Sequence, residues 1–179
     1  MPEAIQVLKG KDKVAALSLF ARESAKSSAL KSKYLIDRFM KDDLGVPEPS
    51  NGYFWSVSHK LDFVAGVVSM EKIGIDVERL KDVSEALFQT IVDPDEAGCF
   101  WGQDKNIIFF RVFTAKEAVL KKTTDGLKGM SKVKTKQVHD DKNITLEYLN
   151  TKYLVENFYF DGYLASVTKD CFDVQWALE

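Results

Sequence analysis

Apolar and polar residues alternate through the last part of the chain, in five short segments that begin near residue 132. A period of two is typical of β-strands with one buried face. Turn-forming residues separate some of these segments, at 140–143 and at 161–162. The pattern therefore predicts a sheet here, with strands at 132–138, 143–149, 152–160, 162–168 and 172–177.

The preceding residues show helical spacing. Apolar side chains recur every three or four positions over 12–43, and the pattern is helical again from 83 to 122. Within the second stretch, Asp93-Pro94 is typical of a capped helix start. The longest helix of this region is predicted at 106–122, before the glycines at 126 and 129.

Between the two helical regions lie three short segments rich in aromatic and β-branched residues, at 53–58, 62–69 and 73–79. Their close spacing predicts an antiparallel meander. The order helix, sheet, helix, sheet predicts an α+β fold in two similar halves. We place the domain boundary between them so that the halves are residues 1–72 and 73–179.

Composition limits the classes of function. The 179 residues carry 25 basic and 27 acidic side chains, a formal charge of −2, so no basic excess indicates nucleic-acid binding. No apolar stretch approaches the ~20 residues of a membrane span, and no secretory signal is visible. Cys99 and Cys171 have no metal-like spacing and are interpreted as reduced thiols. A cytoplasmic protein is expected.

Two carboxylates share one face of the strand predicted at 73–79. Side chains alternate along a strand, so Ile75 is buried while Asp76 and Glu78 point the other way, ~6.5–7 Å apart. Two carboxylates this close repel each other unless a cation lies between them, and oxygen ligands suit Mg²⁺. The alternative is an exposed strand face on which both carboxylates are solvated.

Phe113, Glu117 and Lys121 recur every fourth residue and therefore line one face of the helix at 106–122. This face offers a third carboxylate and a cation for phosphate charge, or else a plain surface ion pair. Ser58-His59 ends the strand predicted at 53–58. Both side chains can donate hydrogen bonds to a phosphate, although a lone histidine is more often structural or solvated.

The order and spacing of these blocks are more specific than any one of them. Ser58-His59, then Ile-Gly-Ile-Asp-Val-Glu at 73–78, then Phe-Thr-Ala-Lys-Glu-Ala-x-x-Lys at 113–121 resemble the signature of the 4′-phosphopantetheinyl transferases. Seventy-two residues precede Ile73, so the chain resembles the longer, Sfp-type form. That form is similar to a fused pseudo-dimer with one active site between its α+β halves, and it implies a monomer.

The resemblance implies a reaction and its residues. Phosphopantetheine would move from coenzyme A to a serine of an apo acyl or peptidyl carrier protein, with release of 3′,5′-ADP. Mg²⁺ would be held by Asp76, Glu78 and Glu117. Glu117 would accept the serine proton, directly or through a bound water, and Lys121 would stabilise the leaving phosphate.

The resemblance also implies contacts with coenzyme A phosphates. These would come from Ser58, His59, Lys116 and Lys121, and from basic residues of the N-terminal half such as Lys31 and Lys33; a solvated helix face explains the latter equally well. Three features depart from the family. The Gly-Lys-Pro element before Ser58 is missing, and Phe113 stands where Trp is common. Lys60 stands where a small residue is common, and it would add a phosphate contact.

Two other classes of function remain open from the sequence. A metal-dependent phosphohydrolase could use the same carboxylates, and it would need no carrier. A non-catalytic module could bind coenzyme A or a carrier without transferring anything, although all three acidic residues are present.

Overall fold

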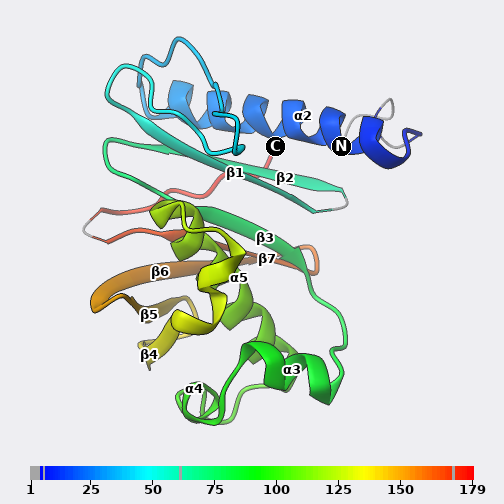
Figure 1. Ribbon diagram of the computed structural model, residues 1–179, viewed down its shortest axis with the longest axis vertical. Helices are drawn as coiled ribbons and strands as arrows, with labels where there is room; N and C mark the ends of the chain where they lie inside the picture. Colours follow the sequence, from blue (N-terminus) through cyan, green and yellow to red (C-terminus); the bar gives the residue numbers. More distant parts are fainter. Residues whose placement is uncertain (1–4, 6, 61, 171) are drawn as a thin grey trace.

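A two-stranded sheet and a five-stranded sheet, each with a long helix against it, form the α+β fold of this chain in the computed structural model (Figure 1). The structure describes residues 5, 7–60, 62–170 and 172–179, so Cys171 lies outside the described residues. The predicted α+β class is confirmed. The two parts differ in size and in topology, and the described residues do not display two similar halves.

Helix α2 (Gly10–Lys31) packs on the small sheet formed by β1 (Phe54–Lys60) and β2 (Phe63–Ser69). Small buried residues on α2, such as Ala21 and Ala25, let the helix approach the sheet closely. Gly66 of β2 is required at this contact, because a Cβ atom there would lie 2.2 Å from the Ala25 nitrogen. The antiparallel pairing of β1 with β2 confirms the first turn of the predicted meander.

Helix α2 is shorter than the predicted 12–43, because Lys33 takes a left-handed conformation with φ of 58°. The Tyr34 N–H then donates to the Ala29 carbonyl at 2.9 Å, which is the hydrogen bond of a Schellman helix end. The apolar residues after it pack on the small sheet from a non-helical segment, and Phe39 meets Trp55 edge to face.

The large sheet has the strand order β3-β7-β6-β5-β4, with all neighbours antiparallel. Four of the five strands predicted after residue 131 are confirmed, although the last, at 172–177, is not a strand. The bounds are β3 (Ile75–Arg79), β4 (Lys134–Val138), β5 (Asn143–Tyr148), β6 (Thr151–Phe160) and β7 (Tyr163–Thr168).

The third strand of the predicted meander pairs elsewhere. β3 lies next to β1 in space but forms its backbone ladder with β7. Serine hydroxyls of β1 take the place of a ladder on the other side: Ser56 Oγ accepts from the Ile75 N–H at 3.2 Å, and Ser58 Oγ from the Val77 N–H at 3.4 Å. The two sheets therefore meet through side chains at the β1–β3 junction.

The segment at 172–177 alternates for a different reason from the strands. Its apolar residues Phe172, Val174 and Trp176 pack against a cluster formed by Ile73, Ile75 and Val167. Trp176 also stacks on Phe158, with ring centroids 4.8 Å apart. An extended segment in which every second side chain packs against the core has the same period of two as a strand, even when it pairs with no other strand.

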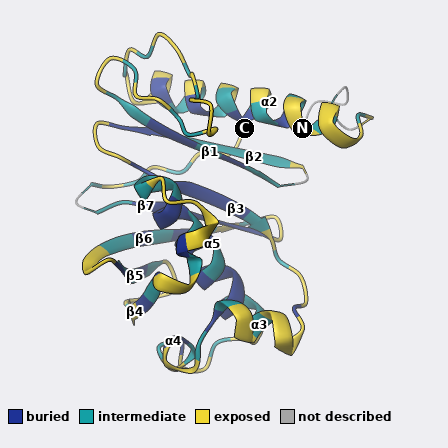
Figure 2. Ribbon diagram, in the orientation of Figure 1, coloured by how far each residue is buried: buried dark blue, intermediate teal, exposed yellow. Residues whose placement is uncertain are grey.

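Helix α5 (Lys105–Thr123) crosses the large sheet, and much of it is buried (Figure 2). Most of its buried apolar residues share one core cluster with residues of that sheet and of the short helices beside it. It confirms the helix predicted at 106–122. The short helices α3 (Glu85–Ile91) and α4 (Pro94–Gly98) precede it, and the 3₁₀ helix η1 (Leu127–Lys132) follows. Asp93 caps α4 in a full capping box with Glu96, as the sequence predicts for this start.

Among the described residues, no helix has the length and apolar character needed to cross a bilayer.

Candidate active site

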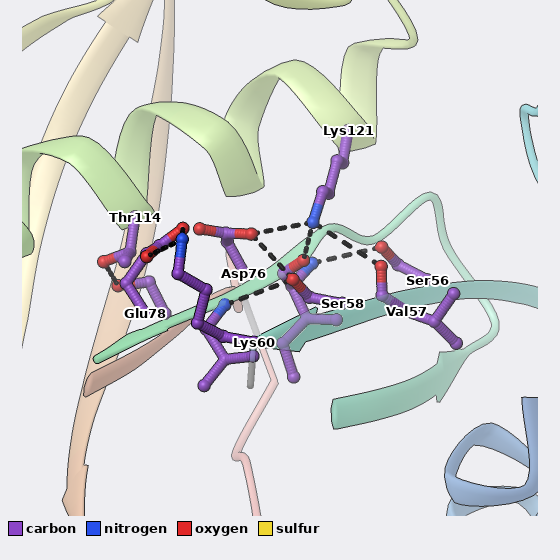
Figure 3. A network of polar contacts seen from close by, with 11 residues as sticks. Ser56, Val57, Ser58, Lys60, Asp76, Glu78, Thr114 and Lys121 are labelled. Atoms are coloured by element: carbon purple, nitrogen blue, oxygen red, sulfur yellow. Dashed lines mark hydrogen bonds and ion pairs between the residues drawn. The ribbon is translucent and has the colours of Figure 1, made fainter. Parts of the chain in front are cut away.

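Asp76 stands where β1, β3 and α5 meet, and its carboxylate is almost buried (Figure 3). Its Oδ1 accepts from the Ser58 hydroxyl and from the Lys121 ammonium, each at 2.8 Å. Its Oδ2 is buried and accepts no hydrogen bond from the described residues. One oxygen of this carboxylate is therefore held in place, while the other lacks the partner that buried polar atoms normally have.

The close approach of α5 to β3 brings Lys121 to Asp76. Gly74 makes this approach possible, because a Cβ atom at that position would lie 1.9 Å from the Ala118 carbonyl oxygen. Lys121 Nζ also donates to the Ile75 carbonyl at 3.0 Å. Lys121 is thus the ion-pair partner of Asp76, and the plain surface pair with Glu117 is not what the structure shows.

Glu117 lies one helical turn before Lys121 on α5, in the field of both strand carboxylates. Burial raises the pKa of Glu117 to about 7, and the negative charge of Asp76 adds to the increase. Lys121 opposes it by favouring the charged form. A carboxyl group with a pKa near neutrality can accept and release a proton at ordinary pH.

Glu78 is the second carboxylate on this face of β3, and its partner is Lys60. The face is mostly covered, so the alternative of two solvated carboxylates on an exposed strand is not what the structure shows. The Lys60 ammonium contacts both carboxylate oxygens, at 2.7 Å and 3.1 Å. Burial raises the pKa of Glu78, and the hydrogen bond and charge of Lys60 work against that increase. Asp76 and Glu78 therefore each lie against one ammonium group, which offsets the repulsion expected between them.

Several basic side chains act on one another near Asp76. Burial lowers the pKa of His59, and the charges of Lys121 and Lys41 lower it further. The pKa of Lys41 is itself lowered, first by burial and then by the charges of Arg22 and Lys121. Lys41 thus lies within electrostatic reach of Arg22, His59 and Lys121, an arrangement suited to an anion.

Sequence reasoning missed Arg22 and Lys41. Arg22 lies on α2, and its Nε is buried without a partner among the described residues. Lys41 lies after the helix, in a stretch that the sequence predicted to be helical. No sequence pattern predicts that Lys41 belongs to the site, because its position depends on the path that the chain takes after Lys33.

A pocket of about 310 Å³ opens beside Lys121. The loop from Asp42 to Pro49 and the aromatic residues Phe54 and Trp55 form one wall, and the end of α5 forms another. The pocket combines aromatic and prolyl surfaces with three lysines and with the acidic residues Asp42 and Glu48. Its apolar surface and its lysines suit a ligand that has both an apolar part and a negative charge.

Three lysines predicted to bind phosphate lie away from the centre of this cluster. Lys116 is buried in the core, where its ammonium binds Glu96 Oε2 and the Ile91 carbonyl, both at 2.7 Å. The geometry therefore does not support a phosphate contact by Lys116. Lys31 pairs with Glu179, and Lys33 is exposed at the left-handed turn after α2.

The acidic side chains do not form a closed metal cage. Within the described ranges, no three His, Cys, Asp or Glu side chains form a group that could hold a metal ion. Ammonium groups instead contact Asp76 Oδ1 and both oxygens of Glu78. The three acidic residues lie within electrostatic reach of one another, but the sequence did not predict that Lys121 pairs with Asp76 and Lys60 with Glu78.

Carboxylates, ammonium groups and an adjoining pocket at the meeting of two sheets define a class of site suited to a phosphate-containing ligand. Comparison with known proteins narrows the class. A family model described as the 4′-phosphopantetheinyl transferase superfamily matches residues 72–168, more than half of the chain. The chain belongs to the 4′-phosphopantetheinyl transferase superfamily. The matched segment includes Asp76, Glu78, Glu117 and Lys121.

The chain is also similar, at low sequence identity, to two curated proteins. The chain is 24% identical over 116 residues to the 4′-phosphopantetheinyl transferase ffp of Bacillus subtilis, which covers 62% of this chain and 51% of the relative. It is 30% identical over 98 residues to the 4′-phosphopantetheinyl transferase psf-1 of Bacillus pumilus, which covers 52% of this chain and 42% of the relative. The chain thus spans about half the length of the curated relatives it matches.

Proposed function

We propose that this chain transfers the 4′-phosphopantetheine group of coenzyme A to a serine of an apo acyl or peptidyl carrier protein, and releases 3′,5′-ADP. The observation that carries the proposal is the convergence of Ser58, Asp76 and Lys121 from three separate elements. Two of the three lie in the segment that matches the superfamily. Transfer of this group by the two curated relatives is part of their names and supports the same reaction here.

Two of the acidic residues at the site fit a divalent cation, although the acidic side chains do not form one metal-binding group as they stand in the described residues. Asp76 Oδ2 is a buried oxygen without a partner, and Glu117 is an acid whose pKa is raised by burial and by negative charge. A cation beside these two groups would provide the missing partner of Asp76 Oδ2 and would favour the ionised form of Glu117. Asp76, Glu78 and Glu117 would hold Mg²⁺, which would neutralise charge on the coenzyme A pyrophosphate.

The residues of the chain account for the proton and the charge. The carrier serine oxygen forms a bond to the β-phosphorus, and the bridging P–O bond breaks with its electron pair leaving on 3′,5′-ADP. Glu117 takes the serine proton, directly or through a bound water. The Lys121 ammonium, held at Asp76 in the resting site, would offset charge on the leaving phosphate.

The basic side chains near Asp76 would bind coenzyme A before the reaction. His59, with its lowered pKa, is uncharged at neutral pH and donates one N–H, while Lys41 and Arg22 supply positive charge. Ser58 fixes Asp76 and lies at the same strand end. Lys31 and Lys33 remain predictions for the 3′-phosphate. The pocket beside Lys121 would take part of coenzyme A, with Trp55 and the prolines in place of the missing Gly-Lys-Pro element.

We further propose the Sfp-type arrangement, in which one chain holds a complete site between its halves, 1–72 and 73–179. Support comes from the contacts between β1, on one side of this boundary, and β3 and α5, on the other. Such a site needs no second copy of the chain.

The test is incubation with coenzyme A, Mg²⁺ and a panel of apo carriers, followed by mass spectrometry of each carrier. The expected result is a gain of the phosphopantetheine mass on at least one carrier, with no gain for the Asp76→Ala variant. Breakdown of coenzyme A without a carrier would instead indicate a phosphohydrolase. Binding of coenzyme A with no change in any carrier of the panel would indicate a binding module.

A further inference from the structure

Lys60 occupies an unusual place beside the proposed metal site. It follows Ser58 by two residues on β1, so both side chains leave the same face of that strand. Asp76 and Glu78 have the same relation on β3. Strand β1 therefore presents one side chain to each carboxylate: a neutral hydroxyl to Asp76 and a charged ammonium to Glu78.

The two carboxylates consequently differ in what they can still bind (Figure 3). Asp76 keeps one oxygen without a partner among the described residues. Both oxygens of Glu78 contact the Lys60 ammonium, at 2.7 Å and 3.1 Å. The Glu78 side chain is 15% exposed, against 38% for Lys60, so little water competes with this pair on the carboxylate side.

We propose that Lys60 is a tethered counter-ion that competes with the divalent cation for Glu78 and so sets the metal affinity of the site. The inference rests on the proposed function, because it assumes a metal at these carboxylates. A metal ion that approaches Glu78 must displace the ammonium or bind within a few ångströms of it. Displacement breaks the pair, and proximity adds repulsion between like charges, so both weaken metal binding.

Asp76 and Glu117 then carry most of the metal binding, and Glu78 contributes less than its place in the sequence motif implies. With Lys60 in place, the site releases its metal more readily. Without the ammonium, Glu78 becomes a full carboxylate ligand.

The experiment measures Mn²⁺ binding to the full chain without coenzyme A, from the loss of the free-ion electron paramagnetic resonance signal. Lys60→Met keeps the apolar stem and removes the charge, and we expect it to tighten binding by about tenfold or more. Lys60→Arg keeps the charge, and we expect an affinity within about threefold of wild type. Circular dichroism verifies that each variant is folded.

A matched control separates the local effect from the change in net charge. Lys136→Met also removes one ammonium from a lysine–glutamate pair, here with Glu147. Lys136 lies on β4, at the edge of the large sheet opposite β3. The control should bind Mn²⁺ as wild type does.

The outcomes distinguish the two proposals. Equal or weaker Mn²⁺ binding by Lys60→Met than by wild type, with Asp76→Asn reducing binding, overturns the role of Lys60 alone. Mn²⁺ binding that is unaffected by Asp76→Asn overturns the metal site on which the proposed function depends. Tighter binding by Lys60→Met and by Lys136→Met alike shows a general charge effect and also overturns the role of Lys60.

Discussion

At the scale of single residues, Asp76 and Lys121 form the centre of the site. Their ion pair is mostly removed from solvent, with side-chain exposures of 9% for Asp76 and 30% for Lys121. Removal of one partner from such a pair leaves a charge with poor solvation, so its loss costs more than that of a surface pair. The same pair holds the lysine beside the place where phosphate charge would develop.

We expect a coupling energy of at least ~1 kcal/mol between Asp76 and Lys121 in a double-mutant cycle of Asp76→Asn and Lys121→Ala. The measurement is the free energy of unfolding in urea. The exposed pair of Lys26 with Glu23, 3.6 Å apart, provides the matched cycle and should couple by no more than ~0.5 kcal/mol. Equal coupling energies in both cycles would show that Lys121 forms only an ordinary surface ion pair.

Catalysis should also depend on Lys121. Lys121→Ala is expected to lower kcat for transfer by ~10²-fold or more, the range for one preorganised donor. Coenzyme A affinity should fall much less, because His59, Lys41 and Arg22 would still bind the anion in the proposed site. Steady-state transfer to an apo carrier measures both quantities, and near-normal kcat in a folded variant would contradict the assignment.

Glu117 makes stability depend on pH. Its folded-state pKa of about 7 lies above the ordinary value of 4.5, so between these values the folded protein holds the proton more tightly than the unfolded chain. Its contribution to stability is full below about pH 4.5 and is lost as the pH rises through about 7. Glu117→Gln avoids this loss, because an amide does not ionise.

The melting temperature of Glu117→Gln relative to wild type should therefore be higher at pH 8 than at pH 5. Mg²⁺ at pH 8 should narrow the difference by stabilising the wild-type carboxylate. Glu71→Gln, at an exposed position, is the control for loss of one carboxyl group. A relative melting temperature that does not change with pH would show that the Glu117 pKa is not raised.

At the scale of elements, the contact between α5 and β3 determines the site. Helix α5 approaches the strand at Gly74, where backbone atoms of the helix occupy the space of a side chain. Glu117 and Lys121 are on that helix and Asp76 on that strand, so a shift of α5 separates the groups of the site. The packing of α5 on β3 therefore determines the distances between the carboxylates and the ammonium group of the candidate site.

Gly74→Ala should destabilise the protein by ~3 kcal/mol or more and abolish transfer, since backbone of α5 must move. Gly98→Ala is the matched control, because a Cβ atom there has no neighbour within 4 Å. That change should leave stability within ~1 kcal/mol of wild type. Urea unfolding measures both, and a tolerated Gly74→Ala would show that α5 does not pack as described.

At the scale of the whole molecule, the C-terminal segment joins the two parts. Trp176 donates from Nε1 to Glu156 at 2.8 Å and stacks on Phe158 of the large sheet. Beside it, Ala65 and Val67 of the small sheet pack on the same cluster as Val174. Further on, Glu179 accepts from Ser27 of α2. The segment therefore contacts both sheets and the helix of the N-terminal part.

We expect Trp176→Ala to cost ~2–3 kcal/mol of unfolding free energy, toward the low end for tryptophan because its side chain is only partly buried. The change should also raise the KM for coenzyme A, since β1 and β3 carry opposite sides of the site. Trp101→Ala is the matched control, because Trp101 is 96% exposed. It should change stability by less than ~0.5 kcal/mol. Similar losses from the two changes would contradict a joining role.

Oligomeric state is a second property of the whole molecule. Because β1, β3 and α5 of one chain supply the site, we expect transfer activity from a monomer. Light scattering coupled to size exclusion, with the transfer assay on each fraction, provides the measurement. Activity confined to a larger species would contradict a site complete in one chain.

The sequence alone determined most local structure, and its three motif blocks predicted Ser58, Asp76 and Glu117 as site residues. Period-two alternation located β4 to β7, and helical spacing located α5. These succeed because side-chain direction in strands and helices depends on local geometry. Lys33 shows the limit: its left-handed conformation ends α2, while the apolar period continues past it.

Only the tertiary structure decided which groups face each other. The choice of β7 as the partner of β3, the core position of Lys116, and the ammonium groups against Asp76 and Glu78 all depend on contacts between distant segments. Alternation places a side chain on one face of its own strand, and it contains no information about what another strand or helix brings to that face. The partners of long side chains such as Lys60 and Lys121 depend on how the sheets and α5 pack against each other. The geometry of the candidate site is therefore a result of that packing.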